Sequence, residues 1–116
     1  MDHEFTTEKL GDSRSLVTLS GRITAVNNAD IKKKIQELVD TGSRELVFDL
    51  SGVSFMDSSG LAAFVSAMKK TREAGGWIKL AALPELTRSI FTLTQLDRVI
   101  DLYPDVKSAL RSTEKS

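Results

Sequence analysis

The chain has 116 residues, which is enough for one compact domain with a single core and too few for two ordinary domains. Its 16 basic residues balance 16 acidic residues, so no overall field attracts nucleic acid or an anionic membrane surface. Cysteine is absent and the single histidine is His3, which argues against disulfides, thiolate metal sites and histidine-based acid–base catalysis. With no basic and apolar leader and no apolar run of about eighteen residues, we expect a cytoplasmic protein without membrane insertion.

The N-terminal segment predicts a β-hairpin. Residues 15–21 (SLVTLSG) alternate in side-chain type and contain β-branched residues, which suits a pleated strand. The preceding FTTEKLGDSR can pair with it through a turn at Gly11-Asp12. We therefore expect two neighbouring strands at the start of the chain.

A helix is predicted over residues 27–42 because apolar residues recur at the spacing of one helical face. Asn27 or Asn28 is expected to cap its N-terminus, and Gly42 is expected to end it. The three lysines at 32–34 splay by about 100° per residue, so they predict a solvated face and no stripe for nucleic acid. The apolar residues of the face are Ile31, Ile35, Leu38 and Val39.

The middle of the chain predicts a buried strand followed by a helix. Residues 45–50 (ELVFDL) carry three apolar residues in succession, which is typical of a strand buried on both faces at the centre of a sheet. Residues 61–75 (LAAFVSAMKKTREAG) show helical spacing, with basic residues near the C-terminal end and Gly75 as a stop.

The C-terminal third predicts two more strand and helix pairs. The strands are expected at 77–83 and 98–103, and the helices start at Pro84 and Pro104. We expect the polar tail from about Ser112 to fray. The apolar residues assigned to the first of these helices are Leu86, Ile90, Phe91 and Leu93.

This alternation of strands and helices predicts an α/β fold. We expect one domain over residues 1–116, with a mainly parallel sheet of four to five strands, an N-terminal hairpin strand and about four helices. In such open sheets, functional groups gather beyond the carboxyl ends of the strands.

The stretch Asp57-Ser58-Ser59 lies at such a position, directly before and at the start of a predicted helix. Its simplest interpretation is a helix cap, because all three residue types accept hydrogen bonds from backbone N–H groups. A second interpretation is a surface serine that another enzyme phosphorylates. A phosphate there would add roughly −1.5 to −2 charges close to apolar neighbours such as Phe55 and Leu61 and would expel a partner.

Enzymatic alternatives lack their required residues. A serine hydrolase needs Gly-x-Ser-x-Gly and a histidine base, and the glycine-rich patterns that cradle phosphates are absent. Asp49 and Asp57 could hold a divalent metal ion, but no third ligand can be named. We therefore expect no enzymatic activity, no cofactor and no bound metal.

Three long stretches resemble STAS domains, and within them the bacterial anti-sigma factor antagonists. They are LVTLSGRITAVNNADIKKKI, ELVFDLSGVSFMDSSGLAAFVSAMKKTREAGGWIKLAAL and PELTRSIFTLTQLDRVIDLYPDVKSAL, from about Leu16 to Leu110. FDLSGVSFMDSSGL is the specific part, and the order and spacing of the rest support it.

The resemblance implies a partner-switching protein. In that family the serine after the motif's aspartate, here Ser58, is phosphorylated by an anti-sigma factor that is also a serine kinase. The unmodified antagonist binds that kinase and frees the sigma factor, the phosphorylated form lets go, and a PP2C-type phosphatase restores it. ATP and magnesium belong to the kinase. The resemblance and the neighbouring positions together give these expected partner-binding residues: Arg22, Thr24, Phe55, Met56, Asp57, Ser58, Ser59, Gly60 and Leu61.

The resemblance also assigns roles around Ser58: Asp57 helps present it, Ser59 helps start the helix, and Gly60 permits close approach. One position departs from the family pattern. Many such antagonists read Gly-x-Leu-Asp, whereas this chain reads Gly-Arg-Ile-Thr at residues 21–24, so Thr24 replaces an acidic residue near the serine. This departure leaves an alternative open, namely a STAS subunit that regulates a transport complex or another signalling assembly.

Overall fold

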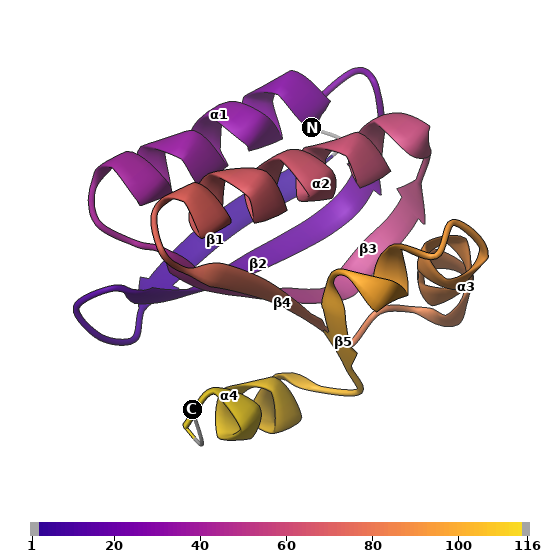
Figure 1. Ribbon diagram of the computed structural model, residues 1–116. Coiled ribbons are helices and arrows are strands. Elements are labelled where there is room, and N and C mark those ends of the chain that lie inside the picture. The colour runs from indigo at the N-terminus through magenta and orange to yellow at the C-terminus, as the bar shows by residue number, and fades with distance from the viewer. Residues whose placement is uncertain (1–2, 115–116) are drawn as a thin grey trace.

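The computed structural model describes residues 3–114 of the chain as one twisted five-stranded sheet with helices on both faces (Figure 1). The strand order is β1-β2-β3-β4-β5, with β1 antiparallel to β2 and every other neighbouring pair parallel. The strands are β1 (His3–Lys9), β2 (Arg14–Ile23), β3 (Glu45–Met56), β4 (Trp77–Ala81) and β5 (Asp101–Tyr103). The helices are α1 (Asn28–Asp40), α2 (Ser58–Glu73), α3 (Glu85–Leu93), the 3-10 helix η1 (Leu96–Arg98) and α4 (Val106–Glu114).

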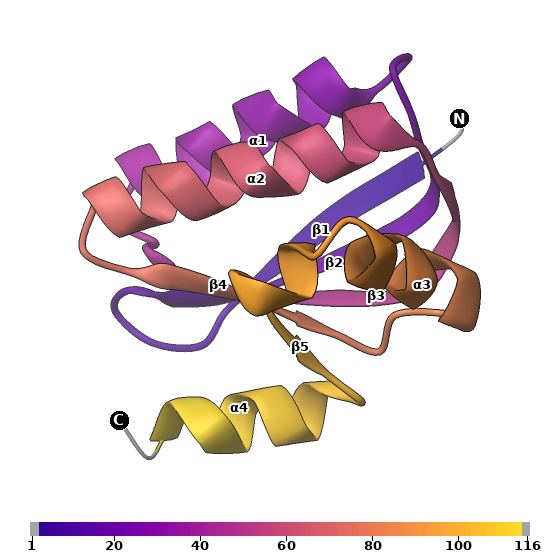
Figure 2. The ribbon, with the colours of Figure 1, turned by 45° about the vertical axis from the view of Figure 1, so that its right-hand side comes forward.

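The predicted fold class is confirmed. The N-terminal strands form the expected hairpin, and the segment 45–50 lies in β3, the central strand of the sheet. Its Leu46, Val47 and Phe48 are fully buried, because α1 to α3 cover one face of the sheet and α4 packs on the other (Figure 2).

The larger core lies between the sheet and helices α1 to α3. Three aromatic rings connect its layers: Phe48 of β3 meets Phe64 of α2 edge to face at 5.4 Å, and Phe64 meets Phe91 of α3 at 6.0 Å. Such pairs contribute about 0.5–1.5 kcal/mol each beyond their burial. This chain of contacts fixes α3 against both α2 and the central strand.

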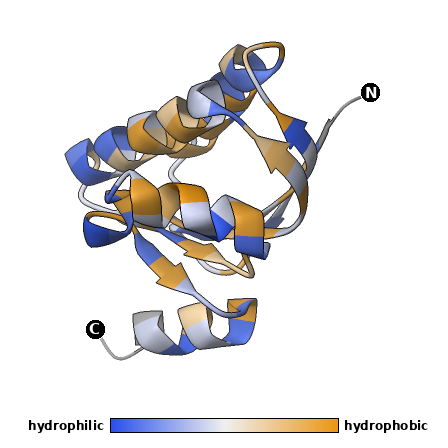
Figure 3. Cartoon of the chain, turned by 90° about the vertical axis from the view of Figure 1, so that its right-hand side faces the viewer, coloured by the Kyte–Doolittle hydropathy of each residue, from blue (hydrophilic) through white to orange (hydrophobic). Residues whose placement is uncertain are grey.

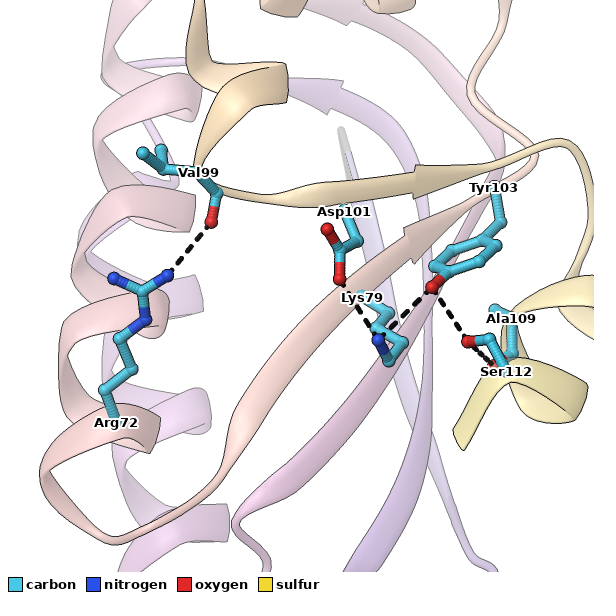
Figure 4. A network of polar contacts seen from close by, with 7 residues as sticks. All are labelled: Arg72, Lys79, Val99, Asp101, Tyr103, Ala109 and Ser112. Atoms are coloured by element: carbon cyan, nitrogen blue, oxygen red, sulfur yellow. Dashed lines mark hydrogen bonds and ion pairs between the residues drawn. The ribbon is translucent and has the colours of Figure 1, made fainter. Parts of the chain in front are cut away.

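The smaller core lies under α4 and is supported by a polar network (Figure 4). The Lys79 amine donates to Asp101 at 3.1 Å and to Tyr103 at 3.2 Å, and the Ser112 hydroxyl donates to the Tyr103 oxygen at 2.8 Å. Burial works against the charge on Lys79, but the hydrogen bonds and the electrostatic attraction of Tyr103 and Asp101 together outweigh it and raise the pKa of Lys79 above its ordinary value. The network joins β4, β5 and α4. On the opposite side, Arg72 of α2 donates to the Val99 carbonyl at 3.1 Å.

The central strand is longer than predicted. It was expected to end at Leu50 but continues to Met56, because β2 extends alongside it through two bulges. β4 stops opposite Asp49, so the last part of β3 is paired on one side only. Helix α2 correspondingly begins at Ser58, three residues before its predicted start.

In the C-terminal third, the helix expected from Pro84 is confirmed as α3, and the last predicted strand is shorter than expected. Leu86 and Leu93 are 81% and 82% exposed, because α3 directs Thr87 and Phe91 into the core. The predicted strand at 98–103 is shortened to β5, since the chain first makes η1 after the left-handed Gln95.

The expected start of the polar tail falls inside α4. That helix continues to Glu114, and the Ser112 hydroxyl also donates to the Ala109 carbonyl at 2.9 Å. Only the last two residues of the predicted tail lie outside the described residues.

Candidate functional site

The start of α2 displays one serine and fixes its neighbours. Asp57 is extended, with φ −105° and ψ −171°, and its carboxylate accepts from the backbone N–H of Ser59 at 2.9 Å and of Gly60 at 3.2 Å. This is the predicted side-chain cap. Ser58 is exposed as the first residue of the helix, whereas Ser59 is half-buried.

Close packing beneath the helix start requires Gly60. A Cβ atom at this position would lie 2.5 Å from the Met56 side chain and 2.9 Å from the Ile23 carbonyl oxygen. The glycine therefore lets α2 begin directly on the end of β2. Met56, Gly60 and Leu61 are buried, so these three predicted contact residues support the site from below and offer little side-chain surface to a partner.

The loop between β2 and α1 is attached to the same place. The Asp57 N–H donates to the Ile23 carbonyl at 3.2 Å, and the Asn28 amide donates to the Ser59 carbonyl at 3.4 Å. The buried Asn27 accepts from the Thr24 N–H at 3.0 Å. Its amide also donates to the carbonyl of Arg22, in β2, at 2.7 Å. The predicted side-chain cap of α1 by Asn27 is therefore wrong, because this side chain closes the loop instead.

The remaining predicted contact residues come from the end of β2, the loop after it and the end of β3. Thr24 is half-buried, and its hydroxyl accepts from the Val26 N–H at 3.2 Å. The guanidinium of the exposed Arg22 lies 4.6 Å from the centre of the Phe55 ring, which is 44% exposed. β2 and β3 bring these two together as register partners.

Sequence reasoning missed Val26. It is 84% exposed at the tip of the loop that contacts the start of α2. The sequence contained a signal for it, because Val26 is an apolar residue in the short segment between Gly21 and Asn27, which was assigned to no helix or strand.

The geometry makes Ser58 the accessible hydroxyl. Within residues 3–114, no side chain or carbonyl hydrogen-bonds the Ser58 hydroxyl, so it is free to meet a phosphoryl donor. A phosphate at a helix start is favoured by the dipole and the exposed N–H groups, and the domain would tolerate it without unfolding. Ser59 is less suitable because its backbone takes part in the cap and in the contact with Asn28.

A metal site built from Asp49 and Asp57 is contradicted by the fold. Asp49 is not at a strand end, since β3 continues past it, and the seven strand residues between Asp49 and Asp57 place their Cα atoms about 26 Å apart. The Asp49 carboxylate accepts from the Ser51 N–H at 3.0 Å. In the described part of the chain, no three acidic, histidine or cysteine side chains gather as metal ligands would. Nor does any helix among these residues have the length and apolar character to span a membrane.

The fold and site define a class of small α/β domain that displays an exposed serine at the start of its second helix. Comparison with known proteins gives the family: the sequence model of the STAS domain matches residues 5–109. The chain belongs to the STAS domain family.

Its relatives include proteins named as anti-sigma factor antagonists. The anti-sigma-B factor antagonist of Bacillus subtilis (strain 168) is 34% identical over 86 residues, which cover 74% of this chain and 78% of that protein. An anti-sigma factor antagonist structure from Mycobacterium paratuberculosis has a TM-score of 0.84 at 31% identity, covering 95% and 92% of the two chains. The unphosphorylated anti-sigma factor antagonist SpoIIAA has a TM-score of 0.84 at 18% identity, covering 97% and 98%, which shows a shared fold.

Proposed function

We propose that this protein is an anti-sigma factor antagonist whose binding is gated by phosphorylation of Ser58. In the unphosphorylated state it binds an anti-sigma factor serine kinase and thereby frees the sigma factor. The observation that carries the proposal is the exposed and unbonded Ser58 hydroxyl at a rigid, capped helix start. The family and the named relatives support the same conclusion.

The surroundings of Ser58 explain how one phosphate would release a partner. Val26 and Phe55 are exposed apolar residues of the loop and the strand that adjoin the start of α2, and a partner resting on them would exclude water. Phosphorylation adds roughly −1.5 to −2 charges to that contact, and a charge left unpaired in a dry interface is costly. The capped helix keeps its shape, so the change acts on binding and not on folding.

The other residues of the site have distinct proposed roles. Arg22 and Thr24 lie on the rim of the contact and select the kinase, whereas Asp57, Ser59 and Gly60 hold the serine in place. The protein needs no catalytic group of its own, because the kinase supplies ATP and magnesium. A PP2C-type phosphatase restores the unphosphorylated form, and the cycle runs in the cytoplasm without nucleic acid or membrane insertion.

The test uses an anti-sigma factor serine kinase, which is to be sought among the genes beside this one. Incubation with that kinase and ATP should place one phosphate on Ser58, as mapped by mass spectrometry, and Ser58→Ala should remove it. Ser58→Asp should weaken binding of the kinase at least tenfold in calorimetric titration. The matched control is Ser54→Asp, which adds the same charge at another exposed serine and should change the affinity much less.

Two outcomes would overturn the proposal. One is phosphate on another residue while Ser58 stays unmodified. The other is full kinase binding by Ser58→Asp, which would mean that charge at the start of α2 does not control the contact.

A further inference from the structure

The sheet ends at β5, an edge strand that pairs with β4 on one side only among the described residues. The Ala82 N–H donates to the Tyr103 carbonyl at 3.0 Å, so the backbone of Tyr103 faces β4. Successive residues of a strand direct their backbone groups to alternate sides, and the N–H and carbonyl of Leu102 therefore face away from the sheet. The side chain of Leu102 packs on the larger core. This residue thus offers its backbone at the edge, and an extended chain matches that pair of donor and acceptor.

A hollow of about 800 Å³ lies between this edge and α3. Leu102 and Tyr103 line it on the strand side, and Arg88 and Thr92, one helical turn apart, line it on the helix side. Figure 3 looks onto this end of the molecule and shows α3 above β5, with α4 below both. A groove between an edge strand and a helix suits an extended peptide, because the peptide bonds to the backbone of the strand while its side chains meet the helix.

The two ends of the hollow carry opposite charges. Helix α3 begins beside the C-terminal end of β5, because it follows β4 after the loop 82–84, and η1 leads into the N-terminal end of β5. Arg88 therefore lies toward the end of β5, and Asp97 and Asp101 lie toward its start. Among residues 3–114 the side chains of Arg88 and Asp97 form no ion pair, whereas Asp101 is bound by Lys79. The hollow thus offers a ligand one free positive charge and one free negative charge.

We propose that the groove between α3 and β5 binds an extended peptide segment of a partner protein, which adds to the sheet beside β5. The peptide bonds the N–H and the carbonyl of Leu102. It carries an acidic side chain toward Arg88 and a basic side chain toward Asp97. None of the residues that line the hollow belongs to the surroundings of Ser58, so this groove is a second binding surface.

The opposite edge of the sheet is less suited to such a peptide. β1 carries Glu4, Glu8 and Lys9, and charged side chains along an edge protect it from pairing with another chain. The hollow between β1 and α1 measures about 240 Å³. On β5 the one charged residue is Asp101, and Lys79 binds it from the neighbouring strand at 3.1 Å. The difference in volume and charge singles out the edge at β5.

Titration of the isotopically labelled protein with a short peptide, followed by nuclear magnetic resonance, tests the proposal. The probe is Lys-Val-Thr-Val-Glu with acetylated and amidated ends, because β-branched residues favour an extended chain. Parallel to β5, its lysine meets Asp97 and its glutamate meets Arg88. Amide shifts should gather at Arg88 and at residues 101–103, and hydrogen exchange at the Leu102 N–H should slow. We expect a dissociation constant of about 0.1–1 mM, because exposed ion pairs and single hydrogen bonds each contribute little.

A charge reversal checks the contact at Arg88. Arg88→Glu should weaken binding at least about threefold, and a peptide with lysine in place of the glutamate should bind this variant better than the wild type. The matched control is Arg44→Glu, which makes the same change at an exposed arginine outside the hollow and should leave the affinity unchanged. A peptide with N-methylated amides at its three central residues keeps its side chains but lacks the donors, and it should lose most of its affinity.

Three outcomes would overturn the proposal. They are amide shifts that are absent with millimolar peptide or confined to other surfaces, an unchanged affinity of Arg88→Glu, and equal binding of the N-methylated peptide. The last would mean that side chains alone hold the peptide and that no strand is added. Ser58→Asp should leave the affinity for the peptide unchanged, so the groove and the phosphorylation site can fail separately.

Discussion

The start of α2 and the helix α3 are both exposed, but they are held in place by different means. At the start of α2, local polar contacts do the work: Asp57 caps two N–H groups, and Asn28 donates to the Ser59 carbonyl from the neighbouring loop. Helix α3 has no side-chain cap, and it is held by Phe91 in the core.

The difference explains what each region can do. A surface whose polar groups are already satisfied can accept a phosphate without losing its shape, so it suits a covalent switch. A helix fixed from its inner side can leave large side chains of its outer side in solvent, as Leu86 and Leu93 show. Backbone strain is also found next to α3. Ala82, before the helix, has a φ of 60°, and Gln95, after it, has a φ of 63°.

The largest expected effect distinguishes the buried side of α3 from its exposed side. Phe91→Ala should lower the free energy of unfolding by about 4 kcal/mol, because it removes a fully buried ring and leaves a cavity. Leu93→Ala on the outer side should change it by less than about 0.5 kcal/mol. Urea unfolding of the two variants measures both values. Similar losses for the two would mean that the outer side also carries monomer stability.

The next effect concerns the packing under α2. Gly60→Ala should cost about 2 kcal/mol of unfolding free energy, because the new methyl group meets the backbone oxygen of Ile23, which cannot easily move. Gly11→Ala is the control, since nothing lies within 4 Å of its added Cβ. An unchanged urea midpoint for Gly60→Ala would show that α2 does not need this close approach.

Removal of the cap should have a smaller effect. Asp57→Ala leaves two N–H groups without their acceptor and should lower the unfolding free energy by about 1 kcal/mol. Asp57→Asn keeps an oxygen acceptor and should lower the unfolding free energy by only about a few tenths of a kcal/mol. Thermal unfolding followed by circular dichroism compares them, and equal losses would argue that the negative charge matters more than the hydrogen bonds.

The smallest predicted effect is a gain. Gln95→Gly should raise the unfolding free energy by roughly 0.5–1 kcal/mol, because glycine adopts the left-handed conformation without steric cost. Thr94→Gly, one residue earlier at φ −87°, should lower it. A loss of stability for Gln95→Gly would show that the glutamine side chain stabilises this turn by contacts that outweigh the strain.

Much of the fold followed from local patterns. The alternation of strands and helices, the hairpin turn at Gly11-Asp12 and the capped start of α2 were all predicted, because each depends on neighbours a few residues away. Predictions failed where a distant segment or a competing local hydrogen bond decided the outcome. β3 extends past Leu50 because β2 continues beside it, and Asn27 bonds back into its own loop instead of capping α1.

The candidate site shows the same division. Asp57, Ser58 and Ser59 were recognised from residue types, and the structure gives each a different exposure or bond. No local pattern separated the buried Met56 and Leu61 from the exposed Phe55 beside them. Which of these side chains is buried depends on how the end of β3 is oriented against the core.

The sequence by itself determined the order of the elements and the position of Ser58 at the start of a helix, because helical periodicity, strand alternation and capping act over short stretches of chain. The tertiary structure decided which side of each element faces the solvent. It brings Asn28 against Ser59, 31 positions apart, and sets Gly60 on the carbonyl of Ile23. It also turns Leu86 and Leu93 outward, because the buried Phe91 can face the core in only one orientation of α3.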